Sequence, residues 1–222
     1  MYPWLIQMST SAAMVIAALL PIMNPLGGAP VFLGMTGEAS DKDRAWLASR
    51  VAINTAIINM SSLLLGSYML AFFGISEGAV RVAGGFMVIS FAWELNKTAG
   101  VPAGRDVDQH AKMDRSSLRM QAFYPLAFPL TTGAGCISIA ITLGAHVLGM
   151  HGEAKWFALG GAAIGIFLSS LTVFICYRFA ARLLSLLGET GSRVMLRLAA
   201  FILMCIGVQI FWEGVRSFIR EI

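Results

Sequence analysis

The stretch Asn24-Pro25-Leu26-Gly27-Gly28-Ala29-Pro30 interrupts a long apolar run near the start of the chain. Two prolines and two glycines within these residues break a helix, because proline lacks an amide N–H and glycine is a poor helix former. A second stretch, Pro129-Leu130-Thr131-Thr132-Gly133-Ala134-Gly135, also reads Pro-Leu followed by small residues and lies early in the second half. The sequence therefore predicts a broken helix in each half of the chain.

The composition around these stretches is that of a membrane protein. Of the 222 residues, 57% are hydrophobic and 13% are charged, and the mean hydropathy is +0.74. Soluble domains have roughly 45–50% apolar and about 25% charged residues, and about 20 apolar residues cross a bilayer as a helix. Apolar segments fall at 4–37, 46–73, 77–96, 121–150, 156–186 and 195–218. We therefore expect an all-α membrane protein with six transmembrane helices, of which the first and fourth are broken at the Pro/Gly segments.

The two halves of the chain are predicted to be inverted repeats. Residues 1–96 and 121–222 each hold three spans, and a polar linker at 97–120 joins them. Residues 73–84 also resemble residues 187–200, and each of these segments leads into a span that ends in Trp-Glu. Because three is an odd number of crossings, the second half must enter the membrane upside down relative to the first. This arrangement is typical of secondary transporters with an inverted-topology repeat.

The distribution of Lys and Arg predicts the orientation. With the N-terminus outside, twelve of the sixteen basic residues lie on the inner side of the membrane. Positively charged connections are retained in the cytoplasm. We therefore expect both termini on the periplasmic side and the linker in the cytoplasm. No Lys or Arg precedes the apolar run at 4–20, so we interpret that run as a retained span rather than a signal peptide.

Several other functional classes are disfavoured by the residues that carry chemistry. Cys136, Cys176 and Cys205 lie in apolar runs without paired spacing, so neither a disulfide framework nor a zinc site is indicated. No hydrolase motif or pair of intramembrane carboxylates occurs, which argues against an enzyme, and no cofactor is predicted. The net charge of +4 is not gathered into a patch dense enough for nucleic acid.

The broken helices are the predicted substrate site. Backbone groups freed at a break cannot face lipid, and the N-terminus of the resumed helix has a partial positive charge that suits a carboxylate. Two such termini, related by the repeat, are expected around one pocket. The alternative is that both are ordinary kinks satisfied by neighbouring helices. The predicted substrate-binding residues are Asn24, Pro25, Gly27, Gly28, Thr131, Thr132, Gly133 and Gly135.

Polar side chains within the spans are candidates for the lining of this pocket. These are Asn54, Thr55, Asn59, Ser169, Thr172 and Gln209, and for all of them helix packing is an equally good interpretation. Glu94 and Glu213 are the carboxylates nearest to the membrane interior. They are candidates for ion coupling, although interfacial anchoring is the commoner role. From the residues alone, the coupling ion is open between H⁺ and Na⁺.

The motifs together resemble the MarC family of integral membrane proteins. The resemblance rests on four separated segments in order: residues 24–36, 73–85, 129–137 and 188–209. It implies a multi-pass protein of the bacterial inner membrane that transports small neutral amino acids such as glycine and alanine, coupled to protons rather than sodium. One departure is Gly133-Ala134-Gly135, where the family usually has Gly-Pro-Gly, and this predicts a less rigid second break.

Two other functions stay open at this stage. One is export of other small amphipathic solutes, which requires a wide cavity lined by aromatic residues. The other is a sensor or scaffold that transports nothing, for which the distinguishing feature is the absence of a solvent-reachable cavity near the middle of the membrane. A pocket built from glycine and threonine leaves little room for a substrate side chain, so the sequence favours glycine and alanine over leucine.

Overall fold

The computed structural model describes residues 3–36, 39–98 and 120–221, and within these ranges the chain is helical and contains no strand. The helices are α1 (Pro3–Met23), α2 (Pro25–Met35), α3 (Asp41–Phe73), α4 (Glu77–Thr98), η1 (Ala122–Thr131), α6 (Ala134–Leu148), α7 (Glu153–Arg178) and α8 (Ala180–Glu221). Most of the predicted linker, residues 99–119, lies outside the described residues.

The described residues include several helices that are suited to crossing a membrane. Within the described residues, four helical segments are long and apolar enough to cross a bilayer: Trp4–Met23, Asp41–Gly66, Glu153–Arg178 and Ala200–Ile219. The bent pair of η1 and α6 makes a fifth if it is counted as one span. The segment predicted at 77–96 forms α4, in which the described apolar part is Gly78–Ser90.

Both predicted breaks are present. α1 ends at Met23 and α2 begins at Pro25, with Asn24 between them in a left-handed conformation. η1 consists of wide helical turns in which Tyr124 and Phe128 are extended, and each of these residues precedes a proline, which disfavours the helical conformation. η1 and α6 meet at an angle of 71°. A further interruption, at Gly188 with φ of 65°, divides α8 near its start.

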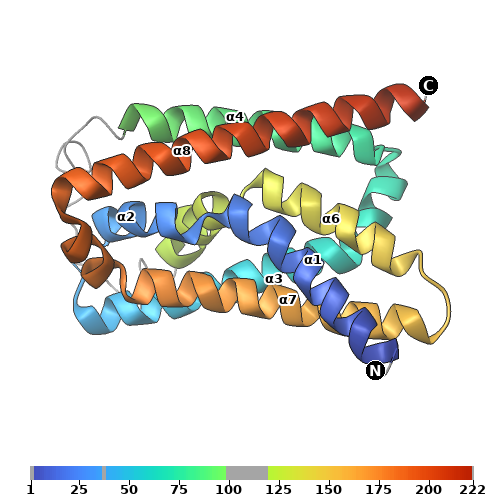
Figure 1. Ribbon diagram of the computed structural model, residues 1–222, viewed down its shortest axis with the longest axis horizontal. Coiled ribbons are helices and arrows are strands. Elements are labelled where there is room, and N and C mark those ends of the chain that lie inside the picture. Colours follow the sequence, from blue (N-terminus) through green and yellow to red (C-terminus); the bar gives the residue numbers. More distant parts are fainter. Residues whose placement is uncertain (1–2, 37–38, 99–119, 222) are drawn as a thin grey trace.

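The helices form an elongated bundle whose two termini lie at the same end (Figure 1). The turns after α3 and after α6 lie at that end too, whereas α2 ends and α8 begins at the opposite end. α4 and α8 run antiparallel in close contact, and a Cβ added to Gly85 would lie 2.7 Å from Phe211 Cα and 2.8 Å from the Gly207 carbonyl oxygen. Such close approach of backbones is typical of small residues in membrane helices.

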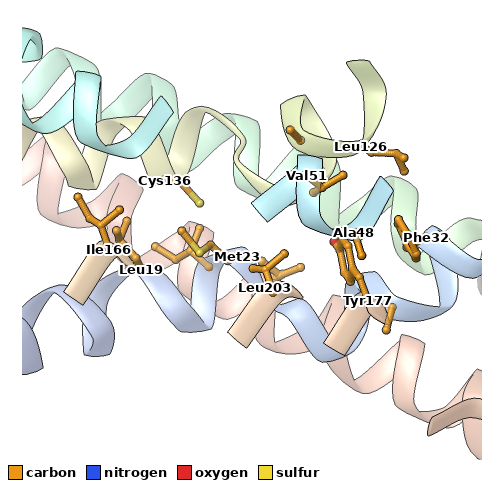
Figure 2. Close-up of a cluster of buried hydrophobic side chains, with 14 of the residues drawn as sticks. Leu19, Met23, Phe32, Ala48, Val51, Leu126, Cys136, Ile166, Tyr177 and Leu203 are labelled. Carbon is orange, nitrogen blue, oxygen red and sulfur yellow. The ribbon is translucent and has the colours of Figure 1, made fainter. Parts of the chain in front are cut away.

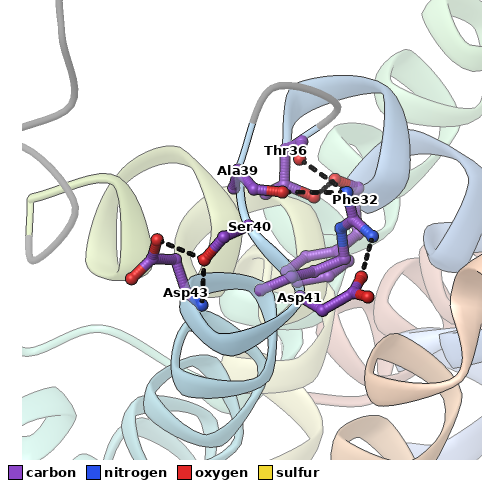
Figure 3. Close-up of polar contacts among 7 residues, drawn as sticks. Phe32, Thr36, Ala39, Ser40, Asp41 and Asp43 are labelled. Carbon is purple, nitrogen blue, oxygen red and sulfur yellow. Dashed lines mark hydrogen bonds and ion pairs between the residues drawn. The ribbon is translucent and has the colours of Figure 1, made fainter.

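The C-terminal end of α2 is fixed by an arginine (Figure 3). The Arg44 guanidinium donates to the carbonyl oxygens of Thr36 at 3.3 Å and Ala39 at 3.1 Å, and it pairs with Asp41 at 3.2 Å. Thr36 in turn donates from its hydroxyl to the carbonyl oxygen of Phe32. The last carbonyls of a helix have no partner within it, and these bonds supply partners to carbonyl oxygens at the end of α2 and just before α3.

Candidate functional site

The first break holds its own cap. Asn24 adopts φ 41° and ψ 59°, a conformation that asparagine tolerates better than most residues. Its side-chain Oδ1 accepts a hydrogen bond from the Gly27 amide at 3.2 Å, and its carbonyl accepts one from the Gly28 amide at 2.9 Å. Since Pro25 has no N–H, the start of α2 has few free donors. The expectation that Gly27 and Gly28 present unused amides to a carboxylate therefore does not match this geometry.

The end of α1 has unused acceptors instead. The Asn24 amide bonds the carbonyl of Leu20, and the chain then leaves the helical path. Pro25 lacks the N–H that would have met the carbonyl of Pro21, and the Gly27 amide is already bonded to Asn24. The last carbonyls of α1 therefore have no helical partner, and they lie at the negative end of the helix dipole. Such an end suits a cation or an ammonium group.

The second break has the opposite character. Gly133 precedes α6 and provides no side-chain cap, so the amides of Ala134 and Gly135 have no acceptor within the helix. Thr132 lies beside this end; its side chain is buried and its hydroxyl oxygen has no hydrogen-bond partner. A polar atom buried in this way is costly unless something binds it. The start of α6 is therefore an uncapped, positive helix end next to an unused hydroxyl.

The two breaks meet inside the bundle. A Cβ on Gly135 would lie 3.4 Å from Ile22 Cγ2, so the first turn of α6 packs against the last turn of α1. A pocket of about 10 Å³, room for about one water molecule, lies at this junction. Its lining comes from both breaks and from α8: Ile22, Met23, Asn24, Gly27, Gly28, Val31, Leu130 and Leu203.

A tyrosine that sequence analysis did not select connects the two breaks. Tyr177, near the end of α7, is fully buried, and its hydroxyl lies 2.9 Å from the Thr131 hydroxyl. Its ring stacks on Phe32 of α2 with centroids 4.6 Å apart, and Figure 2 shows the two rings side by side. A Cβ on Gly28 would lie 2.5 Å from the Tyr177 hydroxyl oxygen. Tyr177 thus touches α2 at the first break and Thr131 at the second.

Three of the predicted lining residues are buried without a full set of partners. Thr55 Oγ1, Asn59 Oδ1 and Ser169 Oγ have no hydrogen-bond partner, although Asn59 donates to the Thr55 carbonyl at 2.9 Å. Asn54 instead ties α3 to η1, because its amide donates to the Ala122 carbonyl at 3.3 Å. These residues belong to α3 and α7, two helices that pack on each other. They are consistent with a polar interior that has unused hydrogen-bonding capacity.

The other predicted residues are placed differently. Thr172 donates to the Leu168 carbonyl of its own helix at 2.9 Å. Gln209 and Glu213 are exposed on α8 and bond each other at 3.2 Å, which is typical of a helix surface rather than of a cavity. The side chain of Glu94 lies outside the described part of the structure. Among the described residues, no group of three or more His, Cys, Asp or Glu side chains is arranged to hold a metal ion.

A second, larger pocket opens near the end of the bundle that carries the termini. Its volume is about 40 Å³, and its polar lining comes from Gln7, Thr10 and Ser11 of α1 and His146 of α6. On the other side of the break region, the Tyr177 ring packs against Phe32 and its hydroxyl lies beside Gly28.

Comparison with known proteins identifies one family of membrane proteins. Residues 9–219 match the family described as "MarC family integral membrane protein". The inner membrane protein MarC of Escherichia coli O1:K1 is 28% identical over 209 residues, which cover 92% of this chain and 94% of that protein. A membrane protein of Aquifex aeolicus is 28% identical over 207 residues, covering 92% of each chain. Neither name states a substrate, and no solved structure matches this chain.

Proposed function

Because this chain belongs to the MarC family of integral membrane proteins and is a multi-pass protein of the inner membrane, we propose that it is a secondary active transporter of small neutral amino acids, glycine and alanine. The observation that carries the proposal is the pairing of helix ends at the breaks. The uncapped start of α6 suits the carboxylate of a zwitterion, and the unpaired carbonyls that end α1 suit its ammonium group.

The residues at the breaks have distinct roles in this proposal. The carboxylate accepts from the amides at Ala134 and Gly135, with the Thr132 hydroxyl as a further donor. Gly133 leaves this end open because it has no side chain. Asn24 and Pro25 terminate α1 so that its carbonyls are free, and Asn24 keeps its side-chain NH₂ for donation. Gly27, Gly28 and Thr131 bound the space in which the substrate is held.

The restricted space at the junction supports small substrates. The pocket holds about one water molecule, and Tyr177 occupies the region toward which a side chain on Gly28 would point. Glycine therefore requires a modest opening of the site, alanine one methyl group more, and leucine a rearrangement of packed side chains. Since an extra methylene in a tight pocket changes discrimination by about 10–200-fold, leucine is expected to be excluded.

The packing of the helices supports an inverted repeat of two three-helix units. If α1 and α2 correspond to η1 and α6, α3 to α7, and α4 to α8, then α2 on α8 corresponds to α6 on α4. In the same way α1 on α7 corresponds to η1 on α3, and both members of each pair of contacts are present. In the proposed repeat the two broken helices correspond to each other, as in transporters with discontinuous helices.

We further propose that both termini face the periplasm and that a proton, rather than sodium, is the coupling ion. The shared end of the two termini in Figure 1 fits the first part, because the end of α7, the start of α8 and the start of α3 lie at the opposite end and carry Arg178, Arg182 and Arg44. The proton is the ion that the resemblance to the family implies. Glu213 and Glu94 are the candidate coupling groups. Because Glu213 is exposed, it would have to bind a proton at the surface of the bundle in this conformation.

A non-transporting sensor is the second candidate, and the small size of the pocket at the breaks favours it. An occluded transporter has the same appearance, so binding and turnover must be measured separately. The test is competition for labelled glycine on the purified protein, followed by counterflow in proteoliposomes. A transporter binds glycine and exchanges it across the membrane. A sensor binds it without exchange, and binding that leucine competes as well as glycine contradicts the small-pocket proposal.

A further inference from the structure

We propose that Tyr177 is the gate and the size limit of the substrate site on the side away from the termini. The inference rests on the proposed function for its substrate, but the gate itself is argued from packing and hydrogen bonding. The sequence pattern does not single out this residue, since Tyr177 stands between Cys176 and Arg178 near the end of an apolar segment.

The direction of its hydrogen bond is determined by its neighbour. The Thr131 hydroxyl lies 2.7 Å from the Leu126 carbonyl, to which it donates its one proton. It is therefore the acceptor for Tyr177, which donates across 2.9 Å. The bond joins the last residue of η1 to the end of α7. A movement that separates the second break from α7 has to break it.

The Tyr177 ring also contacts α2 at the first break. It stacks on Phe32, and its edge and hydroxyl lie 3.3 Å and 2.5 Å from where a Cβ on Gly28 would stand. The Phe32 side chain is itself fully buried. A single side chain therefore fills the gap between the two broken helices and contacts both of them. Any substituent that extends from the pocket past Gly28 meets this ring.

The position of the ring makes it a barrier on one side only. Tyr177 is the second-last residue of α7, at the end of the bundle opposite the termini. The pocket lined by Gln7, Thr10 and His146 lies toward the end with the termini. A substrate held at the junction therefore passes toward the far end only when the ring swings away from Gly28 and the bond to Thr131 opens.

The native Cys136 provides a readout that needs no substrate. Cys136 is buried in the first turn of α6, and its thiol lies 3.8 Å from the carbonyl oxygen of Thr131, the residue whose hydroxyl bonds Tyr177. In a background with Cys176→Ser and Cys205→Ser, we would measure the rate at which a membrane-impermeant maleimide labels Cys136 from each side of sealed vesicles. The variants are Tyr177→Phe and Tyr177→Ala, with the exposed Tyr68→Phe and Tyr68→Ala as matched controls.

We expect the labelling rate of Cys136 to change only in the Tyr177 variants, and only for maleimide added from one side of the membrane. Tyr177→Ala should raise the labelling rate from the side opposite the termini by at least about tenfold, because deletion of a buried ring leaves a cavity. Tyr177→Phe, which keeps the ring and removes the bond, should raise it by about fivefold. The Tyr68 variants should match the unsubstituted protein. Labelling that is the same in the Tyr177 and Tyr68 variants, or equally fast from both sides, overturns the gate.

Competition binding tests the size limit on the same proteins. Leucine should compete with labelled glycine at least about ten times better in Tyr177→Ala than in the parent protein, whereas Tyr177→Phe keeps the parent's discrimination. Unchanged discrimination in Tyr177→Ala overturns the size limit. If the parent binds no glycine while Cys136 labelling still responds to Tyr177, the proposed substrate is overturned and the gate is supported.

Discussion

Gly161 and Gly160 are adjacent residues of α7 that make a matched test of the packing between α1 and α7. A Cβ on Gly161 would lie 2.9 Å from Ser11 Cβ and 3.0 Å from the Met8 carbonyl carbon, with the Met8 carbonyl oxygen nearer still. A Cβ on Gly160 would meet nothing within 4 Å. The replacement of either glycine by alanine adds the same methyl group to the same helix.

The magnitude follows from the difference between the two sites. Alanine is favoured over glycine in a helix by about 1 kcal/mol, and this gain is common to both variants. Only Gly161→Ala overpacks a backbone, which cannot rotate away, and overpacking costs about 1–3 kcal/mol. Gly161→Ala should therefore be less stable than Gly160→Ala by about 1–3 kcal/mol, or about 2–4 °C in Tm for each kcal/mol in a chain of this size.

The assay is reversible unfolding of both purified variants in mixed micelles, with thermal melting as a second measurement. Gly165→Ala should resemble Gly161→Ala, because its Cβ would lie 2.8 Å from both the Ala12 carbonyl oxygen and Val15 Cβ. Equal stabilities of Gly160→Ala and Gly161→Ala would refute the reasoning, since α1 and α7 would then not be in backbone contact at this position.

Three further predictions concern the breaks and the turn after α2. Asn24→Ala should lower the free energy of unfolding by about 1 kcal/mol through loss of the α2 cap, and Asn24→Gly by a few tenths, about 0.3 kcal/mol, because glycine tolerates the positive φ; equal losses in chemical unfolding would argue against the cap. Thr132→Val should weaken glycine binding by about fivefold while the Tm holds or rises, since the hydroxyl has no partner in the unliganded protein; a binding isotherm unchanged from the parent would remove Thr132 from the site. Arg44→Lys should lower stability by about 1–3 kcal/mol because one ammonium group cannot replace both guanidinium nitrogens, Nη2 on the carbonyls of Thr36 and Ala39 and Nη1 on Asp41, whereas the exposed Arg216→Lys should be near neutral; thermal melts in which the two variants agree would contradict this.

The positions of the breaks could be predicted from the sequence because proline and glycine act locally. Within the two stretches predicted as breaks, the helices are interrupted at Asn24 and at Thr132 and Gly133. The close approach at Gly161 and Gly165 likewise follows from small residues spaced four apart. In each case a property of the residue itself, a missing N–H or a missing side chain, decides the outcome without reference to the rest of the chain.

What sequence could not give is how the local groups satisfy one another. The Asn24 side chain turns back to cap Gly27, so the donors expected there are used, while the acceptors at the end of α1 are left free. In the sequence, Tyr177 is one more residue of an apolar segment, next to Arg178. Only the fold brings it into contact with Thr131, 46 positions away. Gln209 faces outward because the Gly85 and Gly207 contact fixes the rotation of α8 against α4.

The polar residues within the helices also show what the sequence can and cannot predict. Thr55 and Asn59 lie on one helix face by spacing alone, and both are buried. Thr172 has the same chemistry, but its hydroxyl bonds its own helix and is not available to a ligand. Residue type and periodicity predict which side chains can turn inward, whereas the neighbouring helix determines which of them keep an unused oxygen.

Transport itself is the central claim, and uptake of labelled glycine into proteoliposomes tests it most directly. The purified protein would be reconstituted and given an imposed proton gradient, then a sodium gradient, then neither. The account predicts accumulation with the proton gradient, competition by alanine, and no competition by leucine. Folded protein that accumulates no glycine under any of these gradients would contradict it.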